Sequence, residues 1–203
     1  MSGVWSADKA RCGVQLSDEG LIQRAGSGEP AAWEAIVGRY RQAVFRYAYL
    51  QVGDAAEAED VAQETFMRAF RSFSRFDRKR PLRPWLLRIA RNVARNRWRG
   101  FSRRARAADR WKHEAAETVT AGAEVPVSLA ETASELERVV ARLNERDRQV
   151  IYLRFFLGLS LEETGEALAL PLGTVKSRLS RALDRLRQRV VQEHPTLRRA
   201  LEE

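Results

Sequence analysis

The side chains best suited to chemistry in this 203-residue chain are cationic and amide groups that recur at helical spacing. Arginine binds phosphate groups at any base sequence, whereas an asparagine amide offers both a donor and an acceptor to a base edge. Steps of three and four residues place one such set on a single helix side: Arg88, Arg91, Asn92, Arg95, Asn96 and Arg99. This combination predicts a surface that binds nucleic acid. A solvated arginine face without a ligand stays open as the alternative.

Aromatic residues flank this cationic face. Phe73 and Phe76 lie in a basic loop over residues 71–84, and Trp85 and Trp98 lie on the helix that follows. Unpaired bases stack on aromatic rings while arginines follow the backbone, so the pattern suits single-stranded DNA. Burial in the core is the competing interpretation of both tryptophans and is favoured for Trp85.

A second cationic face lies between residues 160 and 189. Ser160 and Glu163 have the spacing of a capping box, and Pro171 and Gly173 then interrupt the helical pattern. A second helix is expected from about Thr174, where six basic residues face one acid up to Arg189. Two short helices around a tight turn predict a helix-turn-helix, which places the start of its second helix in the DNA major groove. An ordinary helical hairpin with a solvated basic face is the alternative.

Acidic residues concentrate in one helix that Asp54 is expected to cap, with Glu57 completing a capping box. Charge complementarity at a helix N-terminus explains the first acids but not those further along, Glu59, Asp60 and Glu64. A surface that docks a protein partner is therefore an equal interpretation. Magnesium binding by Asp54, Glu57 and Asp60 is disfavoured because they crowd a capping turn and no supporting ligands occur elsewhere.

Helical periodicity without any alternating strand pattern predicts an all-α fold of two small helical domains joined by a flexible linker, the second ending in the helix-turn-helix. Helices are expected from Ser17 or Asp18, from Pro30 to Val52, from Asp54 to Phe73, and from Pro84 to Gly100. The third has a wide apolar face that includes Phe70. Further helices are expected from Ser134 to Leu143 and from Asn144 to Leu157, the latter with Phe155 buried.

Changes in composition set the domain boundaries. We expect a mobile N-terminus over residues 1–16, a first domain over 17–103, a linker over 104–133, a second domain over 134–193 and a tail over 194–203. The tether would let one chain contact two separated DNA sites.

Charge and cysteine content narrow the function classes. The net charge is +9, and residues 71–110 contain fifteen basic and two acidic residues, which favours a nucleic-acid partner. Cys12 is the only cysteine, so an internal disulfide or a cysteine-based zinc site is excluded, and we expect no metal or cofactor. The chain has no signal-peptide pattern and no long apolar run, so we expect a cytoplasmic protein.

Three segments together resemble the extracytoplasmic-function sigma factors, the small two-domain branch of the bacterial sigma-70 family. They are AEAEDVAQETFMRAF (56–70), RPWLLRIARNVARNRWR (83–99) and the stretch over residues 143–187 that contains PLGTVKSRLSRA. The resemblance covers residues 17–100 and 134–189. It implies a promoter-specificity subunit of RNA polymerase that is not itself an enzyme.

The resemblance also implies a role for each surface. The first segment would grip the clamp helices of the polymerase β′ subunit, through Glu57, Glu59, Asp60, Gln63 and Glu64. The helix over 83–99 would hold the opened minus-ten element, with Asn92 and Asn96 reading bases. The second helix of the helix-turn-helix would read the minus-thirty-five element, through Thr174, Lys176, Ser177, Arg178, Arg181 and Arg185. The β subunit and an anti-sigma factor are expected as further partners, and no small-molecule substrate is expected.

Two other function classes compete with this interpretation. A dimeric helix-turn-helix regulator would need a dimer seam or a sensor pocket, and the sequence has the pattern of neither. An enzyme acting on DNA would need a nucleophile with orienting groups or a carboxylate metal site, which the sequence does not offer.

Overall fold

The computed structural model describes the backbone of residues 16–108 and 135–193 and the side chains of residues 16–97 and 135–192. Within these ranges all regular elements are helices, so the all-α prediction is confirmed. The predictions for the N-terminus, most of the linker and the C-terminal tail fall outside the described residues. No helix in the described ranges has the length and apolar character needed to span a membrane.

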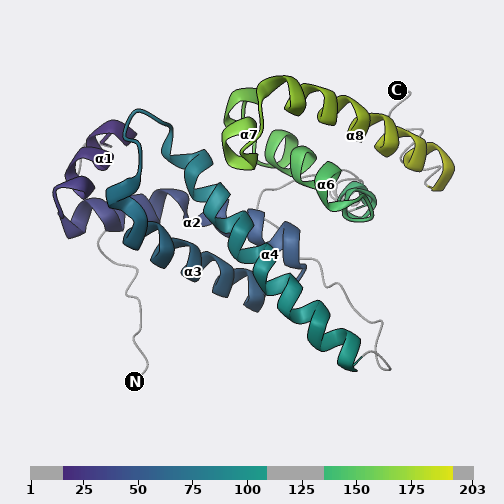
Figure 1. The fold of residues 1–203 in the computed structure, drawn as a ribbon, viewed down its shortest axis with the longest axis horizontal. Coiled ribbons are helices and arrows are strands. Elements are labelled where there is room, and N and C mark those ends of the chain that lie inside the picture. The colour runs from purple at the N-terminus through teal and green to yellow at the C-terminus, as the bar shows by residue number, and fades with distance from the viewer. Residues whose placement is uncertain (1–15, 109–134, 194–203) are drawn as a thin grey trace, which may run out of the picture.

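The helices form two groups (Figure 1). The first group contains α1 (Asp18–Gly26), α2 (Pro30–Val52), α3 (Ala55–Ser72), the short 3-10 helix η1 (Phe73–Arg75) and α4 (Leu82–Ala108). The second contains a helical segment over 135–141, α6 (Glu145–Ile151), the π-helical turn η2 (Tyr152–Phe156), α7 (Leu161–Leu168) and α8 (Leu172–Glu193). The prediction of two small helical domains is confirmed.

Side-chain caps begin four of these helices where the sequence predicts them. Ser17 caps α1, Asp54 caps α3, Asn144 caps α6 and Ser160 caps α7, each by accepting a backbone N–H of the first turn. At Ser160 the reciprocal bond from Glu163 completes the predicted capping box. At Asp54 the box is incomplete, because the Glu57 carboxylate accepts from Arg97 on α4 instead.

The first domain packs α2, α3 and α4 around a main apolar core and a smaller second cluster. The main core contains Ile36, Tyr47 and Leu86 and the second contains Val61, all nearly inaccessible to solvent. Phe73 and Phe76 are also buried and stack on each other with ring centroids 5.7 Å apart. The expectation that these two phenylalanines stay free to stack on bases is therefore wrong, because the loop folds back over the core.

Several predicted boundaries and burials need correction. Helix α4 begins at Leu82 and continues through Gly100, which does not end it, and α8 begins at Leu172. Phe70 and Phe155, predicted on buried faces, are 62% and 55% exposed. Both lie at the edge of an apolar stripe, where helical periodicity does not determine whether a neighbouring element covers the side chain.

The two domains contact each other through α4 and α7. Apolar side chains of both domains belong to one continuous cluster, with Leu87 from α4 and Leu168 from α7 among its members. Hydrogen bonds that cross the boundary include one from Arg83 to the Leu157 carbonyl at 2.5 Å and one from Arg91 to the Leu168 carbonyl at 2.8 Å. The polar side of α4 therefore faces the second domain.

Candidate nucleic-acid interface

The arginine and asparagine face predicted on α4 divides into exposed and covered members. Arg88 and Asn96 are exposed, whereas Arg91, Asn92 and Arg95 are half-buried. The side chain of Arg99 lies outside the described ones. Helix α7 accounts for much of the covering, since its last turn supplies the carbonyl that Arg91 binds.

Acidic side chains of α7 lie opposite the start of this face. Arg80 and Arg88 line a cavity of about 350 Å³ together with Glu162 and Glu166. These two carboxylates of α7 partly neutralise the cationic face of α4. A nucleic acid that used the whole face would have to displace α7.

Arg91 is a partly buried guanidinium with other arginines near it. Burial lowers the pKa of this guanidinium, and the neighbouring charges of Arg95 and Arg88 lower it further, while Tyr47 and Glu145 act in the opposite direction. A group of arginines with few counter-charges favours an anionic partner, because each added negative charge relieves their repulsion.

The second cationic surface is built on a helix-turn-helix formed by α7 and α8. Ala169 ends α7 with a left-handed backbone (φ 56°), and the Leu170 N–H donates to the Gly165 carbonyl at 2.9 Å. Val175 is fully buried beneath the turn. The tight turn therefore fixes where the first turns of α8 emerge.

Five of the six predicted reading residues lie on the first three turns of α8, and Arg185 lies on the fourth. Lys176, Ser177 and Arg181 are exposed, and Thr174 and Arg178 are half-buried. The Ser177 hydroxyl donates to the Thr174 carbonyl at 3.2 Å, and Arg181 Nε donates to the Ser177 carbonyl at 3.1 Å. These local bonds orient polar side chains along the helix toward solvent.

A groove beside α8 adds a residue that sequence reasoning missed. Arg178 and Arg181 line a cavity of about 490 Å³ together with Arg146 from the first turn of α6. Arg146 is exposed and extends the cationic surface onto a second helix. It is far from the helix-turn-helix in sequence, so only the packing of α6 against α8 reveals it.

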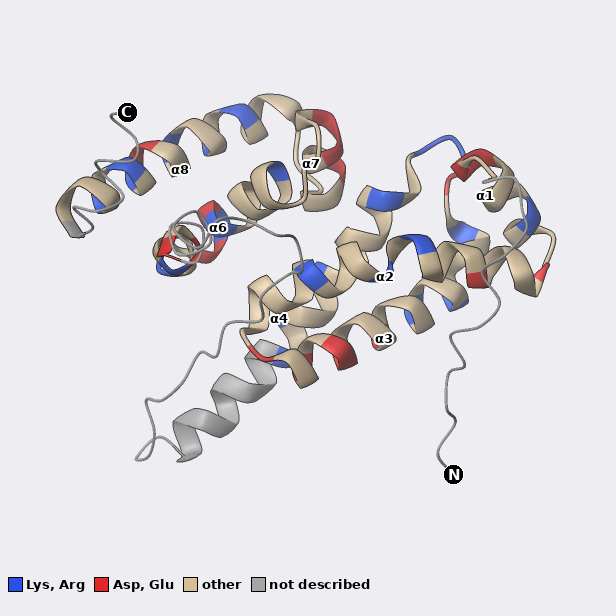
Figure 2. Cartoon of the chain, turned by 180° about the vertical axis from the view of Figure 1, so that it is seen from behind, with Lys and Arg blue, Asp and Glu red and all other residues tan. Residues whose placement is uncertain are grey.

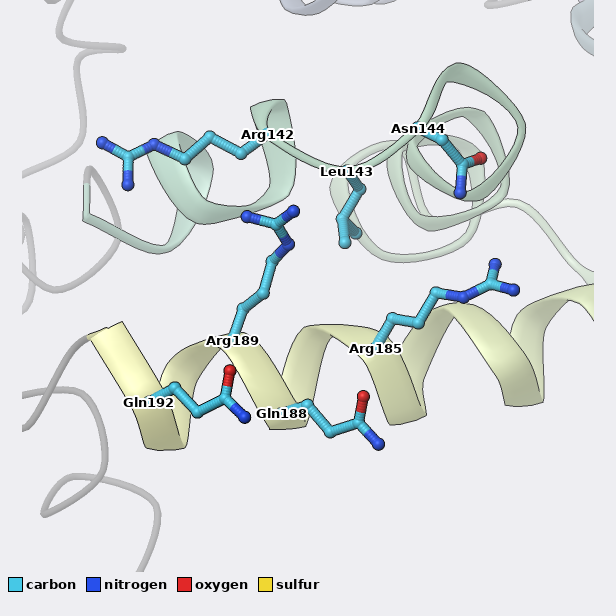
Figure 3. Close-up of a pocket in the computed structure, with 7 residues that line it drawn as sticks. All are labelled: Arg142, Leu143, Asn144, Arg185, Gln188, Arg189 and Gln192. Atoms are coloured by element: carbon cyan, nitrogen blue, oxygen red, sulfur yellow. The ribbon is translucent and has the colours of Figure 1, made fainter.

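Arg185 has a different environment. Its guanidinium forms an ion pair with Asp147, whose side chain is only 5% exposed. Figure 3 shows Arg185 and Arg189 on the side of α8 that faces the segment from Arg142 to Asn144. The structure thus engages Arg185 within the domain, two turns away from Arg178.

Of the acidic residues predicted on α3, Glu57, Glu59 and Asp60 are exposed and Glu64 is half-buried, and each pairs with an arginine. Glu57 and Asp60 bind Arg97 at 2.9 and 2.8 Å, and Glu64 binds Arg68 at 2.6 Å. Glu59 pairs with Arg41 of α2. Figure 2 shows acidic positions on the early turns of α3. No group of three His, Cys, Asp or Glu residues among the described ones could hold a metal ion.

Two apolar side chains continue this surface, and the sequence reasoning did not assign them to it. Met67 and Phe70 are 41% and 62% exposed. They follow Asp60 and Gln63 at steps of three, four and seven residues, so they share the exposed side of α3. This spacing alone could have placed Met67 and Phe70 on the same side of α3 as the acidic residues. We call the set Glu57, Glu59, Asp60, Gln63, Glu64, Met67 and Phe70 the α3 surface.

Comparison with known proteins assigns both domains. Residues 36–104 match the model for Sigma-70 region 2, and residues 139–188 match the model for Sigma-70, region 4. Helix α3 and most of α4 belong to the first match, and the helix-turn-helix belongs to the second.

Curated relatives match along most of their length. The ECF RNA polymerase sigma factor SigW of Bacillus subtilis is 33% identical over 177 residues, covering 83% of this chain and 94% of the relative. The ECF RNA polymerase sigma-E factor of Escherichia coli K12 is 34% identical over 194 residues, covering 91% and 98%.

Solved structures agree with this assignment. CnrH in complex with the cytosolic domain of CnrY has a TM-score of 0.66 at 27% identity, covering 87% of this chain and 98% of that one. The sigma factor RpoE of Bartonella quintana, in complex with the anti-sigma factor NepR, shares the fold with a TM-score of 0.65 at 24% identity, covering 79% and 98%. With region 2 and region 4 matched in one chain, and with ECF relatives aligned over almost their whole length, this protein belongs to the sigma-70 family as an ECF sigma factor.

Proposed function

We propose that this protein is a promoter-specificity subunit of bacterial RNA polymerase and that it works in the cytoplasm with the core enzyme. Residues 17–103 would bind the polymerase and the minus-ten element, and residues 134–193 would bind the minus-thirty-five element. One observation supports this most: a helix-turn-helix and a separate arginine and asparagine face occur in a single region 2 and region 4 chain. The protein is not an enzyme in this proposal, since nucleotidyl transfer belongs to the core.

Helix α8 is the proposed reader of duplex DNA. The residues proposed to contact the minus-thirty-five element are Thr174, Lys176, Ser177, Arg178 and Arg181. Lys176, Ser177 and Arg181 are exposed at the start of the helix, which is the end that enters the major groove in this motif. Arg146 would add a phosphate contact beside them. Arg185 would contribute by positioning α8 through Asp147.

Helix α4 is proposed to bind the opened DNA of the minus-ten element. Its arginines would follow the phosphate backbone while Asn92 and Asn96 bind unpaired bases. Since α7 covers part of this face, the two domains must separate before the minus-ten element can occupy it. Binding to core polymerase would supply the energy for that separation.

The α3 surface is the proposed docking site for the β′ clamp helices. An acidic rim with Met67 and Phe70 beside it suits a partner helix that is basic and has an apolar stripe. The arginines already paired with these acids leave at least part of each carboxylate open to solvent. The β subunit would contact the second domain.

An anti-sigma factor is the proposed negative regulator. The similar protein CnrH has been solved with the cytosolic domain of CnrY. A regulator of this kind would act by occupying the α3 surface, the α4 face or α8, each of which is partly exposed in the described chain.

Gel filtration with core RNA polymerase tests the docking step. We expect the wild-type chain to co-elute with core, and a variant with Glu59→Lys, Asp60→Lys and Glu64→Lys to elute alone. The matched control reverses three exposed acids elsewhere, Glu19, Glu34 and Asp184, and changes the net charge equally. Circular dichroism of each variant shows whether it is folded.

The outcomes are distinct. Loss of co-elution in the α3 variant alone supports docking through this surface. If the wild-type chain does not bind core, the proposed function is wrong, and a dimeric helix-turn-helix regulator becomes the leading interpretation.

A further inference from the structure

A polar cavity lies between the two domains and shares Arg91 and Arg95 with the α4 face. Its volume is about 150 Å³, well above the roughly 30 Å³ that one water molecule occupies in the liquid. Gln51 of α2 and Arg91 and Arg95 of α4 line one side, and Glu145 and Arg148 of α6 line the other. Each domain therefore contributes charged side chains to one cavity.

Most of the buried side-chain atoms without a hydrogen-bond partner belong to residues that line this cavity, and Tyr47 lies close to its charged groups. Among the described residues such atoms are Tyr47 Oη, Gln51 Nε2 and the Nε atoms of Arg91, Arg95 and Arg148. Four of the five are obligatory donors, and the fifth is a hydroxyl that can donate. Buried polar groups in folded proteins are almost always bonded, so a cluster of unmatched donors indicates a missing acceptor.

The guanidinium groups are held in place by their other nitrogens. Arg91 Nη1 donates to the Leu168 carbonyl at 2.8 Å, and Arg148 Nη1 donates to the Ala141 carbonyl at 3.0 Å. These bonds fix the orientation of both side chains, so their Nε atoms are not free to turn toward solvent. The donors that lack a partner are therefore held in fixed positions before any ligand binds.

The charge in the cavity is also unbalanced. Three arginines and one glutamate line it, a formal net charge of +2. The Glu145 carboxylate is itself engaged by Gln149 Nε2 at 2.9 Å. Tyr47 is fully buried among these charges, and burial raises the pKa of its phenol, which keeps the proton available for donation.

We propose that this cavity binds a tetrahedral oxyanion, such as inorganic phosphate, and that the bound anion links the two domains. A tetrahedral oxyanion presents several acceptor oxygens at once, and guanidinium groups match that geometry with strong charge-assisted bonds. Water could satisfy single donors but would leave the positive charge uncompensated. The proposal does not rest on the proposed function, although the site shares Arg91 and Arg95 with the α4 face.

Calorimetric titration of the full chain with inorganic phosphate, against chloride at equal ionic strength, tests the site. We expect one phosphate per chain and a melting temperature raised by about 3–6 °C at a phosphate concentration tenfold above Kd. Arg148→Gln and Tyr47→Phe should each weaken binding, Arg148→Gln by about tenfold. Glu145→Gln should strengthen it, because one repulsive charge is removed.

Arg75→Gln is the matched control, since it removes the same charge from an exposed position in η1. Tyr47→Phe removes only a hydroxyl, so it tests the site even if Arg148→Gln fails to fold. A second titration uses adenosine monophosphate. Binding of phosphate alone assigns a free anion, whereas equal binding of both assigns a phosphate group carried by a small molecule.

The site is wrong if phosphate shows no one-to-one binding. It is equally wrong if Arg75→Gln weakens binding as much as Arg148→Gln does, because that result describes attraction to the whole basic protein.

Discussion

Arg178 and Arg185 lie two turns apart on α8, yet their surroundings give them different roles. Both residues line the same groove, but Arg178 is half-buried there, whereas Arg185 is paired with the buried carboxylate of Asp147. Side-chain type and helical spacing alone make the two residues equivalent. The partner that each one has in the folded domain distinguishes them.

Substitution by alanine separates these roles. Arg178→Ala should weaken binding to a duplex minus-thirty-five element by about 1–3 kcal/mol if it makes a bidentate base contact, with the melting temperature unchanged. Arg185→Ala should instead cost stability, on the order of 1 kcal/mol, because it leaves Asp147 without its ion pair at a half-exposed site. Fluorescence anisotropy with labelled duplex and thermal unfolding measure the two effects. A loss of stability in Arg178→Ala together with a loss of duplex binding in Arg185→Ala would contradict these roles.

Asn92 gives a prediction about opened DNA. With core polymerase present, Asn92→Ala should reduce promoter opening by about tenfold, as expected for losing one base-specific hydrogen bond of 1–2 kcal/mol, while duplex binding stays intact. Permanganate reactivity of unpaired thymines measures the opening. The control is Gln42→Ala, which removes an exposed amide from α2. Normal opening by the Asn92 variant would remove this residue from the proposed site.

At the scale of elements, the turn between α7 and α8 decides where the reading helix points. A Cβ atom added to Gly165 would lie 2.9 Å from the Leu170 carbonyl oxygen, closer than such atoms approach in folded proteins. The absence of a side chain at Gly165 is thus what allows the chain to turn back so tightly. The position of α8 depends on that contact.

Gly165→Ala should therefore destabilise the second domain by about 1–3 kcal/mol, because the backbone of the turn must move. Gly38→Ala is the control: its Cβ would meet nothing within 4 Å, and removing a helical glycine should stabilise the chain by about 0.4–1 kcal/mol. Urea unfolding of both variants measures the difference. Equal stability of the two would show that the turn tolerates a side chain.

The elements differ in how far sequence could predict them. Helix starts at Ser17, Asp54, Asn144 and Ser160 were predictable because a capping side chain acts on its own first turn. The exposure of Phe70 was not, since it depends on whether another helix covers the edge of α3. Contacts between residues far apart in the sequence could not be predicted either, because local patterns do not show which helices pack together.

At the scale of the whole molecule, the docking of the two domains is the main feature that the sequence did not predict. Its bonds join residues more than seventy positions apart, such as Arg83 and Leu157. The arrangement covers part of the α4 face with α7. Access of DNA to that face would thus depend on how often the domains separate.

Arg83→Ala should shift the chain toward separated domains. Losing one partly buried charged hydrogen bond costs about 1 kcal/mol, which changes the ratio of docked to separated molecules about fivefold. Small-angle X-ray scattering of the isolated protein should then give a larger radius of gyration. Arg68→Ala, which breaks a pair inside α3, should leave the scattering curve unchanged. Identical curves for both variants would mean that Arg83 does not hold the domains together.

Transcription in vitro tests the central claim most directly. Core RNA polymerase is incubated with fragmented bacterial DNA, with and without the purified protein, and the 5′ ends of the transcripts are sequenced. We predict new, discrete start sites that appear only with the protein and that share two sequence elements upstream. Start sites that are the same with and without the protein would contradict its assignment as a promoter-specificity subunit.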